Sequence, residues 1–305
     1  MLVVRINLAL FAPTHIIFWE LKSMFARVAS LRQWLPQRWL YAGISVLTIV
    51  AVTIGQPQVS QSADLLQLLL KGAQILQLSN MNDAQEIALG EQTNQSISNE
   101  VKISRNPAMI SYIDRIGQRL ARNSARPNLK YTFQVVEDDN INAFATMGGF
   151  VYINTGLMKA ADNEAQLASV IGHEIGHITG RHSLQQVKQR AISQGVTSLL
   201  GVDRDQVVQI GVQVALTLPN SRQDEYDADR RGLNTMIQTG YAPSAMPEFM
   251  KKLISGGKSS PEFLSSHPAV PERVANLQRM IPAAYRNRTD GLNASTYKQS
   301  IRNFF

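Results

Sequence analysis

The segment His173-Glu-Ile-Gly-His177 constrains this chain most, because it specifies a helix with two metal-binding side chains on one face. Residues four apart in an α-helix lie on the same face, so both histidines can direct a ring nitrogen at one ion. Glu174 lies one position round the helix, where its carboxylate can reach a water molecule at the ion rather than the ion itself. This arrangement is typical of hydrolytic zinc sites. Two neutral imidazoles and a third protein ligand leave one position open on Zn²⁺, which lowers the pKa of water there from 15.7 to about 7.

The residues around this segment favour a buried helix over 162–182. Asp162 is a good N-cap residue. Apolar residues then recur at spacings of three and four, as a buried helix requires: Leu167, Val170, Ile171, Ile175 and Ile178. The alternative is that the histidines are ordinary core or surface residues. However, the chain has only five histidines, and two of them fall at this spacing with a glutamate between them. We therefore predict one zinc ion per chain at His173 and His177.

The third ligand is predicted to come from the segment 221–232. His182 is badly placed, because at 100° per residue it lies about 140° round a continuous helix from His177. We expect it to be a packed or surface histidine. In a helix over 221–232, Glu225 and Asp229 share a face, so Glu225 can bind zinc while Asp229 accepts the second N–H of a ligating histidine. A solvated, charged helix with Arg–Asp pairs is the alternative, and the first motif favours the metal-binding interpretation.

The first 63 residues predict an export leader. Residues 40–54 carry no charge, and Arg27, Arg32 and Arg38 precede them. A positive segment followed by an apolar one is typical of a secretory signal, and the apolar part, extended to 39–55, is near the lower length limit for a membrane-spanning helix. A cleaved signal peptide and a retained signal anchor both fit. Either one places the remaining chain outside the cytoplasm.

Composition favours one folded domain after the leader, which we place at 64–286. The chain has 305 residues, of which 44% are hydrophobic and 17% charged, enough for one substantial core. Residues 1–63 hold five basic side chains and one acidic, so +4 of the formal charge of +7 lies in the leader. This distribution gives no reason to expect a nucleic-acid partner. The absence of cysteine excludes disulfides and cysteine–zinc ligation. The polar tail over 287–305 is expected to be loosely held.

The remaining sequence predicts mainly helices and two short strands. Asn106 before Pro107 is a helix start. Tyr131, Phe133 and Val135 alternate as a half-buried strand does, and Phe150–Ile153 is a second strand after a glycine pair. Helices are also expected over Asp64–Leu78, over Asp203–Leu218, which returns the chain to the site, and after Pro243 and Pro247.

Four blocks between about residues 80 and 285 follow one another in an order typical of one peptidase family. They are Asn142–Met158, the helix with His173 and His177, Ser221-Arg222 with Glu225 and Ala228-Asp229, and Ser265-Ser-His-Pro268 followed by Arg273. Together they resemble the membrane-associated gluzincin peptidases, which include the CAAX prenyl endopeptidase, the heat-shock protease HtpX and periplasmic outer-membrane quality-control proteases. The resemblance implies an α+β, predominantly helical, zincin-like metallopeptidase domain with a small sheet beside the zinc-binding helix.

The resemblance also implies roles for individual residues. His173, His177 and Glu225 would hold zinc, Glu174 would be the general base, and Asp229 would orient a ligand. His267 would approach the open zinc position or stabilise the oxyanion; a surface histidine before a proline is the alternative. The strand Phe150–Ile153 would present an exposed edge, to which an extended substrate adds as a further strand. An ordinary interior strand is the alternative there.

We therefore expect a zinc endopeptidase that cleaves misfolded envelope or membrane-associated proteins. The substrate class follows from the resemblance alone. The resemblance also implies a periplasmic or membrane-associated protein, in contact with a membrane surface or anchored in the membrane. The alternative is a chaperone-like binding protein that keeps the fold and has a gated, rarely active protease site. Glu174 argues against an inactive enzyme, because a binding protein has no need of a general base.

Overall fold

The structure is a computed structural model that describes residues 81–194, 204–255, 262–268 and 271–305. The predicted leader over 1–63 and the helix expected over Asp64–Leu78 lie outside the described residues. In the described ranges, every helix is too short or too polar to cross a membrane.

A small three-stranded sheet forms one side of the core. Its strands are β1 (Thr132–Val136), β2 (Ala143–Ala145) and β3 (Phe150–Asn154), in the order β1-β3-β2. β1 runs parallel to β3, and β2 runs antiparallel to it. Both predicted strands are therefore confirmed as strands. Gly148 and Gly149 have φ values of 79° and 96°, so the turn between β2 and β3 uses the left-handed region that glycine adopts without strain.

The free edge of the sheet differs from the one predicted. β3 contains Phe150–Ile153, but it lies in the centre of the sheet, pairs on both sides and is buried along its whole length. The expectation of an exposed edge at Phe150–Ile153 is therefore wrong. A short apolar run has the same sequence pattern in a central strand as in a covered edge strand. The edge strand on this side is β2.

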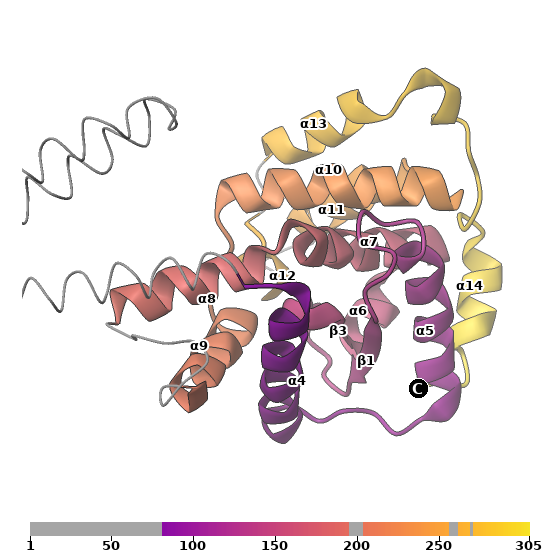
Figure 1. Ribbon diagram of the computed structural model, residues 1–305. Coiled ribbons are helices and arrows are strands. Elements are labelled where there is room, and N and C mark those ends of the chain that lie inside the picture. Colours follow the sequence, from indigo (N-terminus) through magenta and orange to yellow (C-terminus); the bar gives the residue numbers. More distant parts are fainter. Residues whose placement is uncertain (1–80, 195–203, 256–261, 269–270) are drawn as a thin grey trace, which may run out of the picture. The chain divides into compact units, whose positions relative to one another are not determined.

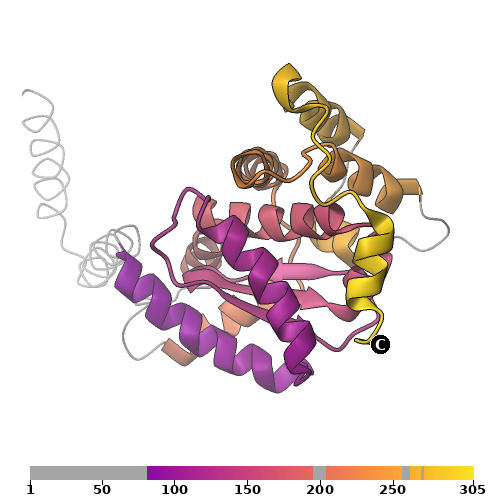
Figure 2. The same cartoon turned by 90° about the vertical axis from the view of Figure 1, so that its right-hand side faces the viewer.

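Helices make up most of the described chain and surround the sheet (Figures 1 and 2). They are α4 (Asp83–Glu100), α5 (Pro107–Ala121), α6 (Thr155–Ala160), α7 (Glu164–Gly180), α8 (His182–Ser193), α9 (Arg204–Leu216), α10 (Arg222–Thr239), α11 (Ala245–Ser255), α12 (Glu262–Ser266), α13 (Pro271–Met280) and α14 (Ala294–Ile301), with short 3₁₀ turns η2 (Met147–Gly149) and η3 (Ala283–Tyr285). A predominantly helical α+β domain with a small sheet is thus confirmed.

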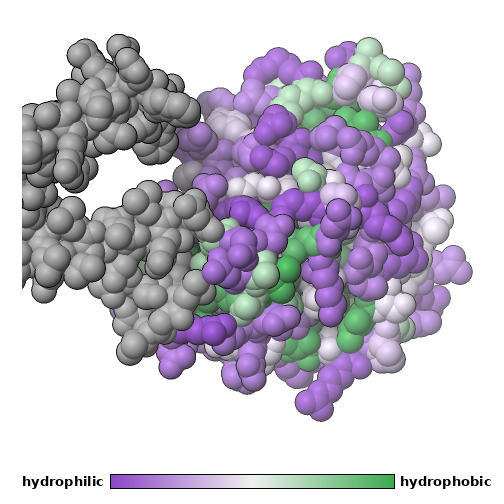
Figure 3. Space-filling model, viewed as in Figure 1, coloured by the Kyte–Doolittle hydropathy of each residue, from purple (hydrophilic) through white to green (hydrophobic). Residues whose placement is uncertain are grey.

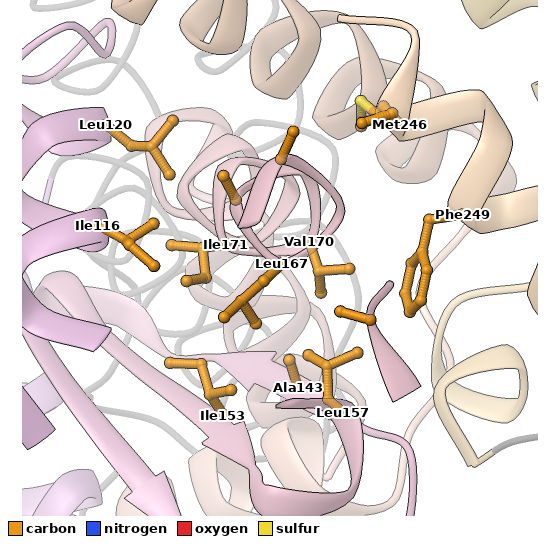
Figure 4. Packing of buried hydrophobic residues seen from close by; sticks show 14 of the residues in the cluster. Ile116, Leu120, Ala143, Ile153, Leu157, Leu167, Val170, Ile171, Met246 and Phe249 are labelled. Carbon is orange, nitrogen blue, oxygen red and sulfur yellow. The ribbon is translucent and has the colours of Figure 1, made fainter. Parts of the chain in front are cut away.

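Helix α7 is the centre of the core. Its side chains Leu167, Val170 and Ile171 lie between residues of α5, the sheet and α11 (Figure 4). Every residue of α7 from Ala165 to Ile178 is buried. The helix starts one residue later than predicted: Asn163, not Asp162, is the N-cap and accepts a hydrogen bond from the Gln166 amide. Hydrophilic residues cover most of the face shown in Figure 3, as expected when the apolar residues gather round one central helix.

The C-terminal segment is part of the core. The expectation of a loosely held tail over 287–305 is wrong, because α14 buries Tyr297 and Ile301 to 1% and 8% exposure. The Tyr297 hydroxyl donates a 2.6 Å hydrogen bond to the Met158 carbonyl, and the Ala165 amide donates to the Gly291 carbonyl. The polar composition of the tail conceals these few anchoring residues.

Glycines let α7 and α10 approach each other closely. A Cβ on Gly176 would lie 2.5 Å from the Ala228 carbonyl oxygen, and one on Gly232 would lie 2.9 Å from backbone atoms of Gly172 and His173. The two backbones are therefore nearly in contact beside His173 and His177, the predicted metal ligands on α7.

Replacing Gly176 by alanine should destabilise the domain, whereas the same change at Gly172 should not. A Cβ on Gly172 meets its nearest atom at 3.4 Å, an ordinary contact, so Gly172→Ala keeps the gain in helix propensity of about 1 kcal/mol. Gly176→Ala must push the helices apart, at a net cost of about 1–3 kcal/mol. Urea unfolding of both variants measures the difference. Equal stability would show that this contact does not fix the helix separation.

Candidate metal centre

Five of the predicted site residues meet in the buried centre of the domain. α7 supplies His173, Glu174 and His177, α10 supplies Glu225, and His267 directly follows α12. None is more than 3% exposed. The chain thus brings together residues up to 94 positions apart, as the distance in sequence between His173 and His267 shows.

The donor atoms have the spacing that a zinc ion requires. His173 Nε2 and His177 Nε2 are 3.1 Å apart, and they lie 3.4 and 3.2 Å from oxygens of Glu225. His267 Nδ1 is 3.1 Å from Glu225 Oε1 and 3.3 Å from His173 Nε2. Four ligands held 2.0–2.1 Å from a tetrahedral zinc ion are about 3.3–3.4 Å apart. The donor set and its spacing therefore fit one zinc ion, with His267 as the fourth donor.

Asp229 and Arg273 lie behind the donor atoms. Arg273 of α13 donates two hydrogen bonds of 2.7 Å to the Asp229 carboxylate and lies 2.6 Å from Glu225 Oε2. His173 Nδ1 is 3.1 Å from Asp229 Oδ1. Asp229 is therefore placed to orient His173, and Arg273 in turn fixes Asp229.

The electrostatics of the cluster favour a positive charge between the carboxylates. Burial disfavours the charged form of His173, but Glu225 and Asp229 outweigh burial and raise the pKa of His173 to about 10. Burial would raise the pKa of Glu225, yet His267 and His173 hold that pKa well below its usual range. By contrast, burial lowers the pKa of His177 to about 3 and keeps this ring neutral. A divalent cation can supply the charge that otherwise falls on His173.

Glu174 has the surroundings of a proton acceptor. Both of its carboxylate oxygens are buried and lack a hydrogen-bond partner within the described part of the chain. Burial raises the pKa of Glu174, which brings a carboxylate closer to the range in which it can accept and release a proton. A cavity of about 20 Å³ lined by Glu174, His177 and His267 adjoins these oxygens and has room for one water molecule.

His182 lies beside the site, contrary to the expectation from a continuous helix. Its Nδ1 is 2.9 Å from Nδ1 of His177, and its Nε2 is 3.3 Å from Asp227 Oδ2 on α10. The reason is that α7 ends at Gly180 and Arg181 adopts the left-handed conformation, with φ 57°. This break turns the chain, so that His182 opens α8 close to His177. Burial lowers the pKa of His182.

Sequence reasoning missed two contacts of the site. The break after Gly180 had a signal, because glycine is common where helices end, but nothing marked Arg181 as the left-handed residue. Arg273 belongs to one of the four family blocks, but the sequence did not indicate that it would pair with Asp229. Its signal was a lone basic residue after Ser-His-Pro, which a buried carboxylate such as Asp229 requires as a partner.

The Asp229–Arg273 pair should contribute both stability and zinc affinity. Asp229→Asn removes one of the two buried carboxylates that pair with Arg273, so we expect the unfolding free energy of the metal-free protein to fall by about 3 kcal/mol. Zinc affinity should fall about 10–100-fold, since His173 loses its orienting carboxylate. Urea unfolding and chelator competition measure the two effects.

Asp290→Asn is a matched control. It breaks the Arg119–Asp290 pair, 2.8 Å long, whose side chains are 38% and 51% exposed. Exposed pairs contribute about 1 kcal/mol or less. Equal losses in the two variants would contradict the role assigned to the buried pair.

Comparison with known proteins identifies the family. The model of peptidase family M48 matches residues 107–281, more than half of the chain. The beta-barrel assembly-enhancing protease of Escherichia coli (strain K12) is 30% identical over 259 residues, which cover 79% of this chain and 52% of that protein. The mitochondrial metalloendopeptidase OMA1 of Saccharomyces cerevisiae is 31% identical over 177 residues, which cover 53% and 50%.

The chain therefore spans about half the length of these curated relatives. The matched region includes α5, the sheet, α7, α10 and the segment with His267, so it contains every donor atom of the site. The resemblance predicted from the four sequence blocks is confirmed, and the chain belongs to peptidase family M48.

Proposed function

We propose that this chain is a zinc-dependent endopeptidase that holds one Zn²⁺ through His173, His177 and Glu225. The observation that carries the proposal is the group of four buried donor atoms that all lie within 4.8 Å of one another. Beside it lies the Glu174 carboxylate, whose oxygens make no hydrogen bond within the described residues. Membership of a peptidase family supports the same reaction class.

The chain's residues divide the chemistry of peptide hydrolysis among them. When bound, zinc lowers the pKa of water to about 7 and polarises a peptide carbonyl. Glu174 accepts the proton of the attacking water and then donates it to the departing amine. Because burial raises the pKa of Glu174, this carboxylate suits both proton transfers. Asp229 holds the ring of His173, and Arg273 keeps Asp229 ionised.

We further propose that His267 closes the site at rest. Its Nδ1 takes the fourth corner of the donor group, the position that substrate and water need. Its ring also stacks on Phe263 of α12, with centroids 4.5 Å apart. His267 must therefore leave with α12 before a peptide can enter. His267 is 2% exposed, which supports a gate in the site over a surface histidine.

An extended substrate would then add to β2, the edge strand next to α7. In the closed form α12 covers the start of this edge: the Phe263 amide donates a 3.0 Å hydrogen bond to the Ile141 carbonyl. Asn142 also donates to Glu262 at 3.3 Å. A peptide backbone can replace such bonds by strand addition once α12 has moved.

The proposed substrates are misfolded proteins of the cell envelope or of membranes. Two relatives are named a beta-barrel assembly-enhancing protease and a mitochondrial metalloendopeptidase, which supports a substrate class of this kind. The predicted leader supports an exported, periplasmic or membrane-associated protein whose catalytic domain lies outside the cytoplasm.

Glu174→Gln should leave zinc bound and reduce cleavage of an unfolded protein by about 10²–10⁴-fold, because the general base is lost while every zinc ligand stays. Metal analysis and a protease assay measure the two quantities. Glu248→Gln on the exposed side of α11 is the control and should change neither. If the wild-type protein binds zinc and unfolded protein but cleaves no faster than Glu174→Gln, the chaperone-like alternative is correct.

Two variants, Glu225→Ala and His267→Ala, should distinguish a residue that holds zinc from a residue that closes the site. Glu225→Ala should lose most zinc, because the imidazole donors that remain are neutral and do not balance the charge of the ion. His267→Ala should keep one zinc per chain and cleave faster, because the resting donor is gone. Slower cleavage by His267→Ala would show that this histidine stabilises the transition state instead. Full zinc content in Glu225→Ala would show that Glu225 is not the third zinc ligand.

A further inference from the structure

We infer that His182, supported by Asp227, is a positioning residue for the zinc ligand His177. It accepts the hydrogen bond that fixes which nitrogen of His177 faces the ion and how the ring is turned. The inference rests on the proposed zinc site, and it assigns to His177 a partner different in kind from the carboxylate behind His173.

The break between α7 and α8 places His182 in this position. Arg181 has φ 57° and ψ 31°, a conformation that residues other than glycine rarely adopt. The two imidazole rings then lie with centroids 5.0 Å apart and planes at 79°. Their Nδ1 atoms are 2.9 Å apart, the distance of an N–H···N hydrogen bond.

Ion pairs to α4 hold the break in place. Arg181 Nε lies 3.2 Å from Glu86 Oε2, and its guanidinium also pairs with Asp83. Glu86 is 0% exposed and is fixed by Arg126 at 2.9 Å. α4 therefore anchors the residue with the unfavourable backbone conformation, and His182 is not free to swing away from His177.

The proton positions follow from the contacts. His177 directs Nε2 towards Glu225 and His173, so this nitrogen is the zinc donor and Nδ1 carries the hydrogen. Nδ1 of His182, 2.9 Å away, must then be an acceptor without a hydrogen. A neutral His182 carries its hydrogen on Nε2, which lies 3.3 Å from Asp227 Oδ2. The order is therefore His177 Nδ1–H to His182 Nδ1, and His182 Nε2–H to Asp227.

The carboxylate at the end of this chain is itself held. Arg231 Nε pairs with Asp227 Oδ2 at 2.5 Å, and Arg230 pairs with the other oxygen. Both arginines are on α10 with Asp227, one turn beyond Glu225. A single helix therefore carries the third zinc ligand and the groups that orient the two histidines, since Asp229 serves His173 and Asp227 serves His177 through His182.

A matched pair of substitutions tests the inference in the full-length chain. Asparagine places its amide oxygen where His182 has Nδ1, whereas leucine places a methyl group there. His182→Leu should weaken zinc binding about 10–100-fold, the usual effect of losing a partner of a ligating histidine, and His182→Asn should restore most of the affinity. Chelator competition on the folded protein measures both. Equal affinity in the two variants, whether weakened or unchanged, would overturn the inference.

A second measurement stands even if His182→Leu does not fold. In the zinc-loaded wild-type protein, ¹⁵N NMR of the histidine rings should show the hydrogen on Nδ1 of His177 and on Nε2 of His182. A hydrogen on Nδ1 of His182 would overturn the inference. Failure of the wild-type protein to bind zinc in the same competition assay would instead overturn the proposed function, so the two failures are distinguishable.

Discussion

The close contact between α7 and α10 is the constraint on which the rest of the site depends. Ligand atoms must come within about 3.4 Å of one another to share a zinc ion, and side chains as short as glutamate reach that far only from neighbouring backbones. Gly176 against Ala228 and Gly232 against Gly172 allow this approach. The same contact aligns Asp227 and Asp229 with the two histidines. Small residues between two helices thus determine the chemistry of side chains one turn away.

Burying this many ionisable groups couples the fold to its cation. Glu174, Glu225 and Asp229 lie in the core with one buried arginine, Arg273. Two of these carboxylates raise the pKa of His173 to about 10, so the metal-free site takes up a proton where a cation would bind. A bound divalent cation would replace that proton and balance the carboxylates. Binding energy at the site is therefore also folding energy, and residues such as Arg273 serve both.

Local sequence patterns predicted the helices and strands well, but they predicted the contacts between them less well. The spacing of His173 and His177, the cap at Asn106 and the strand before Val136 are local signals, and the structure confirms these elements. Around Glu225, a solvated charged helix has the same sequence pattern as a metal-binding one, so only the combination with the first motif favours this residue as a ligand. The central position of β3 and the anchoring of Tyr297 depend on contacts between distant segments, for which one sequence gives no local signal. The approach of His182 depends on the left-handed conformation of Arg181, which only the preceding glycine hinted at.

The burial that strengthens the site also closes it to substrate. The proposed function therefore requires an opening that is confined to one segment. α7 and α10 cannot separate without breaking the core. Among the described residues, α12 makes few hydrogen bonds to other segments: Phe263 to Ile141, Asn142 to Glu262, and Asn220 to Ser266. Segments with few such bonds open at much lower cost than the whole domain. A substrate strand on β2 would restore the bond that Ile141 loses. Access is therefore favoured for extended backbones, which unfolded proteins offer and folded proteins do not.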